Sequence, residues 1–218
     1  MKIATWNIQR LDKRENQHIL DKLINLDADI LVLTETNSII QLDNYTCVST
    51  SLLPIEFDGI KYKVGENRVS ILTKYNATTQ HKTFDKYTAV CIDIETPFGP
   101  LTIYGTIIGV FANRQPRFDC DLNGLITDLN IFSGNQLCVL GDFNTTFSGR
   151  VYPSHRARQT LIDTFINFGL TNTTASITDN VDHIVLSNDF LIDKKIEIET
   201  WNHDKKLSDH IGVAVEIF

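Results

Sequence analysis

Acidic, amide and histidine side chains gather in four short segments that lie far apart in this chain of 218 residues. The segments are Asn7 after Trp6, Glu35 after Thr34, the run Gly141 to Asn144, and the run Ser208 to His210. The first three follow apolar runs typical of buried strands, and the fourth precedes the last such run. Because strand ends from distant parts of a chain can meet at one sheet edge, we expect these side chains to form one site.

These residue types suit the hydrolysis of a phosphoester. Such a reaction needs charge neutralisation at the phosphoryl oxygens, a positioned water or hydroxide, and help for the leaving oxygen. Carboxylate and amide oxygens without thiolates favour Mg²⁺ or Mn²⁺ over zinc, with Ca²⁺ as a further option. We therefore expect Asn7, Glu35 and Asp209 to be the metal ligands.

The run Gly141 to Asn144 places an acid and an amide two residues apart after an apolar segment. If strand geometry persists, Asp142 and Asn144 point to one side while Phe143 turns into the packing. The acid can then orient a water and the amide can hold a phosphate oxygen. The alternative is an ordinary turn, because Gly and Asp are frequent in turns.

His210 is the candidate for acid–base or electrostatic work on the phosphate, and Asp182 is the carboxylate expected to pair with it. An aspartate that accepts from one ring nitrogen fixes the tautomer and favours the imidazolium, which leaves the other nitrogen for substrate. His183 follows Asp182 in a strand-like run, so it should face the opposite side of that strand.

The elements that position these residues alternate between strands and helices. Strand-like runs are expected near residues 2–8, 30–34, 69–73, 89–95, 101–108, 137–140, 181–187, 196–200 and 212–217. Helical periodicity groups Ile19, Leu23 and Leu26; then Phe118, Leu122, Leu125, Ile126 and Leu129; then Leu161, Ile162, Phe165 and Ile166. Residues 49–67 lack periodicity and are expected to form a long surface loop near the site. The pattern fits an α+β fold in which two sheets pack face to face with helices outside.

In this order, the motifs Thr5 to Ile8, Thr34 to Thr36, Gly141 to Asn144, Val181 to Ile184 and Ser208 to His210 resemble the endonuclease/exonuclease/phosphatase superfamily. The resemblance implies a four-layer α/β/β/α sandwich of two mainly antiparallel sheets, and catalytic roles for Asp142, Asn144, Asp182 and His210. It also puts Asn113 and Arg114 in a phosphate-contacting loop. One position departs from the family, because Ile107 stands where many members have a phosphate-contacting His or Tyr. Tyr104, three residues earlier, should face the other way.

The residues expected to lie around the entrance of the site are basic. Arg150 is expected to contact the substrate, and His155, Arg156 and Arg158 could line the same entrance or form the solvated face of a helix. Trp201 and Lys205–Lys206 precede the Asp209 motif and could stack on or attract a substrate.

Composition favours a single enzyme domain over residues 1–218, since the chain is 42% hydrophobic and contains no linker or repeat. The net charge of −7 argues against a broad electrostatic grip on polyanions, although a metal ion can supply local positive charge. The cysteines show no metal-type spacing and are expected to be reduced thiols. We expect no signal peptide and no membrane span, and a cytoplasmic location. We also expect a monomer.

Together these features predict a divalent-metal phosphodiesterase, a nuclease that cleaves DNA or RNA by in-line attack of water. One alternative is a phosphomonoesterase acting on an inositol-type, nucleotide or other small phosphate. The other alternative, prompted by Ile107, is a binding module of the same fold with a weakened catalytic site.

Overall fold

The computed structural model describes residues 1–11, 16–109 and 117–218. Its main strands form two sheets of six strands each, with the order β13-β14-β1-β2-β6-β3 in the first sheet and β11-β12-β10-β9-β8-β7 in the second. Only β1–β2 and β9–β10 pair in parallel within these sheets. The mainly antiparallel sandwich expected from the sequence is therefore confirmed.

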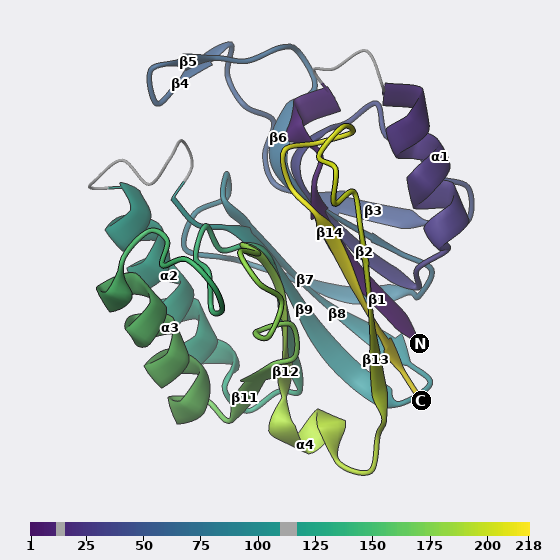
Figure 1. The fold of residues 1–218 in the computed structure, drawn as a ribbon. Helices are drawn as coiled ribbons and strands as arrows, with labels where there is room; N and C mark the ends of the chain where they lie inside the picture. The colour runs from purple at the N-terminus through teal and green to yellow at the C-terminus, as the bar shows by residue number, and fades with distance from the viewer. Residues whose placement is uncertain (12–15, 110–116) are drawn as a thin grey trace.

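The elements of the first sheet come from the two ends of the chain and from its first third. Its strands are β1 (Lys2–Asn7), β2 (Ile30–Asn37), β3 (Thr46–Ser49), β6 (Glu66–Thr73), β13 (Ile196–Trp201) and β14 (Gly212–Ile217). The 3₁₀-helix η1 (Gln9–Leu11) follows β1, and helix α1 (Asn16–Leu26) covers the outer face of the sheet (Figure 1).

The second sheet is built from the middle of the chain. Its strands are β7 (Ala77–His81), β8 (Ala89–Thr96), β9 (Gly99–Ile107), β10 (Leu137–Asp142), β11 (Leu170–Asn172) and β12 (Asp182–Ser187). Helices α2 (Arg117–Phe132) and α3 (His155–Asn167) cover its outer face, and the short α4 (Asn188–Leu191) leads toward β13 (Figure 1).

Three apolar layers hold these elements together. Side chains on the facing surfaces of the two sheets, such as Ile3, Val32, Ile103 and Leu140, form the central layer. The layer under α1 contains Trp6 and Leu31, and the layer under α2 and α3 contains Tyr104 and Val139. Alternate residues of one strand thus enter different layers, as strand geometry requires.

The helix stripes agree with the sequence except on α3. Leu161 and Phe165 are buried, but Ile162 is only partly buried and Ile166 is 70% exposed. The buried stripe instead runs through Ala157, Leu161, Thr164 and Phe165. These positions follow the spacing i, i+4, i+7 and i+8, so Ile166 lies about 100° around the helix from Phe165.

Residues 49–67 were expected to form a long surface loop, but part of this segment is strand. They contain a small hairpin of β4 (Glu56–Phe57) and β5 (Ile60–Lys61), which projects from one end of the sandwich (Figure 1). Its turn is Asp58–Gly59, with φ angles of 53° and 75°. Asp–Gly is a typical pair for a hairpin turn with two positive φ angles, so the sequence carried this signal.

All four cysteines are unpaired, with Cys91 and Cys138 buried and Cys47 and Cys120 exposed. This agrees with the expected reduced thiols. In the described ranges of the chain, no helix has the length and apolar character needed to span a membrane.

Candidate active site

The inward-facing positions of three strands change from apolar to polar at one end of the sandwich. On β1 the row runs Ile3, Thr5 and Asn7, and on β10 it runs Cys138, Leu140 and Asp142. Asp182 begins the matching row on β12. All three terminal polar side chains are at most 1% exposed. Because alternate side chains of a strand lie on one face of the sheet, Asn7, Asp142 and Asp182 lie together between the two sheets.

Asp142 is held by three hydrogen bonds. Its Oδ1 accepts from the backbone N–H of Asn144 at 2.9 Å, and its Oδ2 accepts from Asn7 Nδ2 at 3.1 Å and from Asn144 Nδ2 at 3.2 Å. Burial raises the pKa of Asp142 to about 7, against the opposing effect of His210. A carboxyl that is fixed in position and titrates near neutrality is suited to proton transfer.

Asn144 and Phe143 lie where the spacing predicted, although the strand ends before them. Asn144 has a φ of 46°, yet its amide turns back to Asp142 and also donates to Ile108 O at 2.9 Å. Phe143 is fully buried under α3, where its ring lies 6.0 Å from that of Phe165. A left-handed residue at this point costs free energy, and such strain is common at functional sites.

His210 and Asp182 form the pair expected from the sequence. His210 Nδ1 lies 2.6 Å from Asp182 Oδ2, and only 16% of the His210 side chain is exposed. Burial alone would lower the pKa of His210, but the carboxylates of Asp182 and Asp142 raise it to about 10. The ring therefore carries a positive charge at neutral pH and donates its Nδ1 proton to Asp182.

The backbone around His210 is tied to strand β1. Trp6 Nε1 donates to His210 O at 3.1 Å, and Ser208 Oγ donates to Asn7 O at 2.6 Å while accepting from His210 N–H at 3.2 Å. The serine of the terminal motif thus joins the two ends of the chain. This connection gives the imidazole a fixed distance from Asn7 and Asp142.

Glu35 enters the cluster through an irregularity in β2. Thr34 and Thr36 pair with β6, but Glu35 between them has no partner in the register and has a φ of 45°. The register of β2 with β6 is the same on both sides of Glu35, so this is a local twist of the backbone. It turns the carboxylate toward the cluster, where Oε1 accepts from Asn7 Nδ2 at 3.2 Å. Burial raises the pKa of Glu35, with a smaller raising effect from Asp209.

The three expected metal ligands differ in their surroundings. Glu35 is largely enclosed, whereas the Asp209 side chain is 60% exposed and its Oδ1 lies 3.9 Å from His210 Nε2. Asn7 turns its nitrogen toward the carboxylates, because its Oδ1 accepts from Gln9 N–H at 2.9 Å. In this arrangement Asn7 orients Glu35 and Asp142.

The donor set fits a hard divalent cation. The carboxylates of Asp142, Asp182 and Asp209 surround the imidazolium of His210, and the Glu35 carboxylate also interacts with it. Asp182 Oδ1 is buried and has no hydrogen-bond partner. An excess of carboxylate over local positive charge, with oxygen donors and no thiolate, is the environment that Mg²⁺ or Mn²⁺ stabilises.

The neighbouring strand residues behave as alternation predicted. Ile107 is fully buried in the central layer, and Tyr104 faces the opposite layer, where its hydroxyl donates to Asp128 at 2.7 Å. His183 is also fully buried and points away from Asp182, with Nε2 3.1 Å from the carbonyls of Thr145 and Asn180. None of these three side chains joins the cluster.

A cavity of about 230 Å³ next to the cluster contains Arg150, Tyr152 and Val181. Val181 immediately precedes Asp182, and the Asp142 carboxylate adds to burial in raising the pKa of Tyr152. Thr146 fixes this loop, because its hydroxyl donates to Arg150 O at 2.6 Å and accepts from Tyr152 N–H at 3.0 Å. Arg150, the substrate contact expected from the sequence, lines this cavity together with Tyr152, which belongs to no motif and was not expected.

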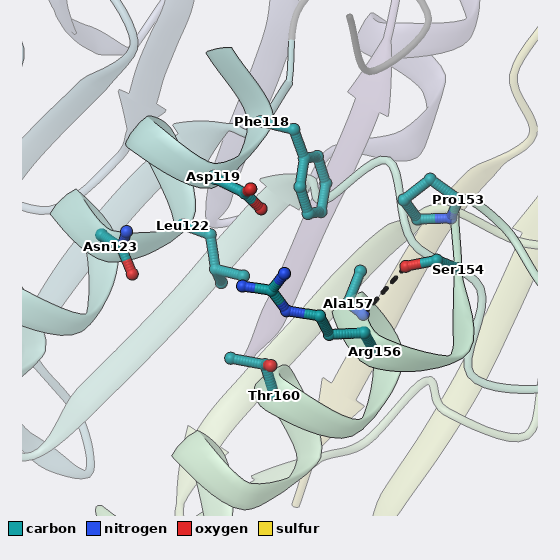
Figure 2. Close-up of a pocket in the computed structure, with 9 residues that line it drawn as sticks. All are labelled: Phe118, Asp119, Leu122, Asn123, Pro153, Ser154, Arg156, Ala157 and Thr160. Carbon is teal, nitrogen blue, oxygen red and sulfur yellow. Dashed lines mark hydrogen bonds between the residues drawn. The ribbon is translucent and has the colours of Figure 1, made fainter. Parts of the chain in front are cut away.

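The other basic residues expected around the entrance, Arg158, Arg156 and His155, do not line this cavity. Arg158 Nη2 donates to Thr146 Oγ1 at 2.7 Å and to Arg150 O at 3.2 Å, so it supports the loop. Figure 2 shows Arg156 lying over a separate groove of about 270 Å³ between α2 and α3, near Leu122 and Asp119. His155 is the exposed first residue of α3.

Trp201 is buried against Trp6, with ring centroids 5.7 Å apart, so it cannot stack on a substrate as suggested. Lys205 and Lys206 are exposed, and Lys206 pairs with Asp204 at 2.8 Å. Asn113 and Arg114 lie outside the described residues.

Residues 4–210 match the sequence model of the Endonuclease/Exonuclease/phosphatase family. The chain belongs to this family. The match spans every motif of the cluster, from Asn7 to His210, and confirms the resemblance drawn from the sequence. No curated protein sequence matches the chain.

Similar solved structures have the same fold. The 3′ phosphatase NExo from Neisseria, bound to a product DNA hairpin, has a TM-score of 0.73 and 16% identity, over 100% of this chain and 99% of that chain. The endonuclease domain of TRAS1, a telomere-specific non-LTR retrotransposon, has a TM-score of 0.74 and 16% identity, over 98% and 96% of the two chains. A family protein from Leptotrichia buccalis has a TM-score of 0.69 and 17% identity, over 100% and 99%.

Proposed function

We propose that this family member is a divalent-metal-dependent phosphoesterase that hydrolyses phosphodiester bonds of DNA or RNA, acting as a monomeric single domain. The observation that carries this proposal is the buried cluster in which Asp142 and Asp182 are register partners and His210 lies 2.6 Å from Asp182. Fixed acids beside a buried imidazolium supply both proton transfer and charge stabilisation for attack on phosphorus.

Asp142 is the residue that orients the attacking water and accepts its proton. The hydrogen bonds from Asn7 and Asn144 hold the carboxylate in one position. Its pKa, raised to about 7 chiefly by burial, allows it to take a proton near neutral pH and release it afterwards. Asn144 would also contact a phosphate oxygen by exchanging one of its two amide hydrogen bonds, to Asp142 or to Ile108, for the substrate.

His210 acts on the phosphate as an imidazolium. Asp182 occupies Nδ1, so Nε2 is the ring nitrogen that would donate to a phosphate oxygen or to the leaving group. Asp182 does not touch the substrate in this proposal. It holds the tautomer and keeps the positive charge on His210.

Glu35 and Asp209 would hold the divalent metal. When bound, Mg²⁺ or Mn²⁺ would neutralise charge on the phosphoryl oxygens. Asn7 remains the proposed third ligand through its amide oxygen, while its Nδ2 holds Glu35 and Asp142 at a fixed separation.

Two features support nucleic acid as the substrate. The similar structures include a 3′ phosphatase bound to a DNA hairpin and a retrotransposon endonuclease domain. The cavity beside Asp182 also combines the guanidinium of Arg150 with the ring of Tyr152, which can contact a phosphate and a base or sugar respectively. Asn113 and Arg114 remain proposed phosphate contacts on sequence grounds alone.

A phosphomonoesterase is the second candidate, because NExo is a 3′ phosphatase. The roles of Asp142 and His210 would be the same for a phosphomonoester. A binding module is the third candidate, because Ile107 is buried and offers no group to the phosphate.

A substrate panel tests these functions directly. Nicked, abasic and single-stranded DNA, RNA, and small phosphomonoesters are incubated with the protein in Mg²⁺ or in EDTA, and products are separated by size and by phosphate release. We expect Mg²⁺-dependent shortening of nucleic acid. Release of phosphate without shortening would favour the phosphomonoesterase, and no product from any substrate would contradict both enzymatic readings.

A further inference from the structure

A cavity of about 450 Å³ lies between the edge strands β3 and β7, at the same end of the sandwich as the acidic cluster. Strand register gives its position. Asp142 pairs with Ile107 on β9, Thr106 pairs with Ala89 on β8, and Ala89 lines the cavity. The route from β10 to β7 crosses three strand spacings, or about 14 Å at 4.8 Å per strand.

The lining of this cavity is basic. His81, Lys82 and Lys86 lie around it together with the hydroxyls of Ser49 and Ser51, and none of the described residues in the lining is acidic. The nearby acids already have partners. Asp93 Oδ2 lies 2.7 Å from His81 Nε2, and Asp85 Oδ2 accepts from Arg117 at 2.6 Å. His81 and Asp93 pair with each other, so Lys82 and Lys86 supply the positive charge of the cavity in a chain with a net charge of −7.

The cavity also contains an exposed aromatic ring. Phe84 is 36% exposed, and its ring packs so closely on Gly124 of α2 that a Cβ at this glycine would lie 2.3 Å from it. A ring held in place beside lysines and hydroxyls can stack on a base while the lysines neutralise phosphates. A membrane surface would not enter such a concave site, and an acidic peptide would gain less from the ring.

We propose that this cavity is an accessory site for the substrate, in which Lys82 and Lys86 bind backbone phosphates of the nucleic-acid strand whose scissile phosphate lies at Asp142. The inference rests on the proposed function, because it gives a second contact to the same strand. The separation of about 14 Å exceeds the reach of a dinucleotide but not that of a longer oligonucleotide, since successive phosphates advance by at least about 3.4 Å.

The test compares Lys82→Gln/Lys86→Gln with a control, Lys194→Gln/Lys195→Gln, which removes the same charge at the opposite end of the sandwich near α4 (Figure 1). Binding of a fluorescent single-stranded 12-mer is measured by anisotropy from low to high salt. Both pairs are placed in an Asp142→Asn background so that the oligonucleotide stays intact. Hydrolysis of the 12-mer and of a dinucleotide is measured with the same lysine variants in the wild-type background.

Removal of two phosphate contacts should lower 12-mer affinity about tenfold or more at 0.1 M salt, and should reduce the slope of log affinity against log salt by about 1.4. Dinucleotide hydrolysis and the control pair should be unaffected. An unchanged slope, an equal effect of the control pair, an equal loss on the dinucleotide, or no 12-mer binding by the parent would each overturn the inference. Failure of the wild-type protein to hydrolyse any substrate would instead count against the proposed function.

Discussion

Asp142 and Asp182 are direct register partners on the antiparallel strands β10 and β12, so two buried carboxylates lie side by side. Like charges directly opposite each other destabilise a sheet unless a cation compensates them. The imidazolium of His210 supplies one such charge, since its Nδ1 lies 2.6 Å from Asp182. A divalent metal would supply the remaining positive charge. The stability of this end of the sandwich would then depend on the same ions that serve its chemistry.

Replacing Asp182 with Asn should lower the pKa of His210. The carboxylates of Asp182 and Asp142 raise that pKa to about 10, whereas burial lowers it. Removing the Asp182 carboxylate therefore leaves the lowering effect of burial less opposed. The imidazolium would then lose its proton at lower pH, and the alkaline limb of the pH–rate profile should shift downward. Imidazole ¹⁵N chemical shifts and the pH–rate profile measure this. Superimposable titration curves for the two proteins would show that Asp182 has no influence on the protonation of His210.

Hydrolysis should vanish in EDTA and return with Mg²⁺ or Mn²⁺, because the cluster has more carboxylates than positive charges. The Glu35→Gln variant should remain folded and need a higher metal concentration for the same rate. Metal titration of activity, with circular dichroism as the control for folding, measures both effects. Full turnover after exhaustive removal of metal would refute this prediction.

The Asn144→Ala variant should lower the turnover number by about 10²-fold while changing KM far less. Its amide donates to Asp142 Oδ2 and Ile108 O, so its loss frees the carboxylate that must hold the water. Steady-state kinetics and thermal melting are measured together. A large fall in melting temperature with near-normal turnover would mark Asn144 as a residue that only shapes the turn.

His183 should make the protein less stable in acid. Burial lowers its pKa to about 4, whereas an unfolded histidine titrates near 6.5. Below pH 6.5 the unfolded state therefore binds more protons at this histidine than the folded state does. The free energy of unfolding falls for this reason as pH drops toward 4. Between pH 7 and pH 5 the loss should be about 2 kcal/mol. Urea unfolding at both pH values should show a smaller loss for His183→Gln, and an equal loss would exclude His183 as the cause.

Much of the site could be predicted because it depends on strand alternation. Asp142 and Asp182 each follow or begin an apolar run, so their meeting at one end follows from a period of two. The pairing of Asp182 with His210 was also foreseeable from residue type. The internal strands were recognisable for the same reason, since their buried positions are apolar.

Features that depend on tertiary contacts were not predictable. Strand β7 (Ala77–His81) is almost entirely exposed and shows no apolar alternation, so it has no sequence signal. The left-handed backbone at Glu35 has no signal in the sequence, and the direction of the Asn7 amide depends on the backbone N–H of Gln9. Tyr152 lies in the cavity beside the cluster, where Thr146 holds its loop in place.

The most direct test of the account is the rate of oligonucleotide hydrolysis in Mg²⁺ by the wild-type protein and by the Asp142→Asn variant. The substitution keeps the size of the side chain but removes the carboxylate that accepts the proton. We predict metal-dependent cleavage by the wild type and a rate at least about 10²-fold lower for the folded variant. Equal rates for the two proteins would contradict the assignment of this cluster as the catalytic centre.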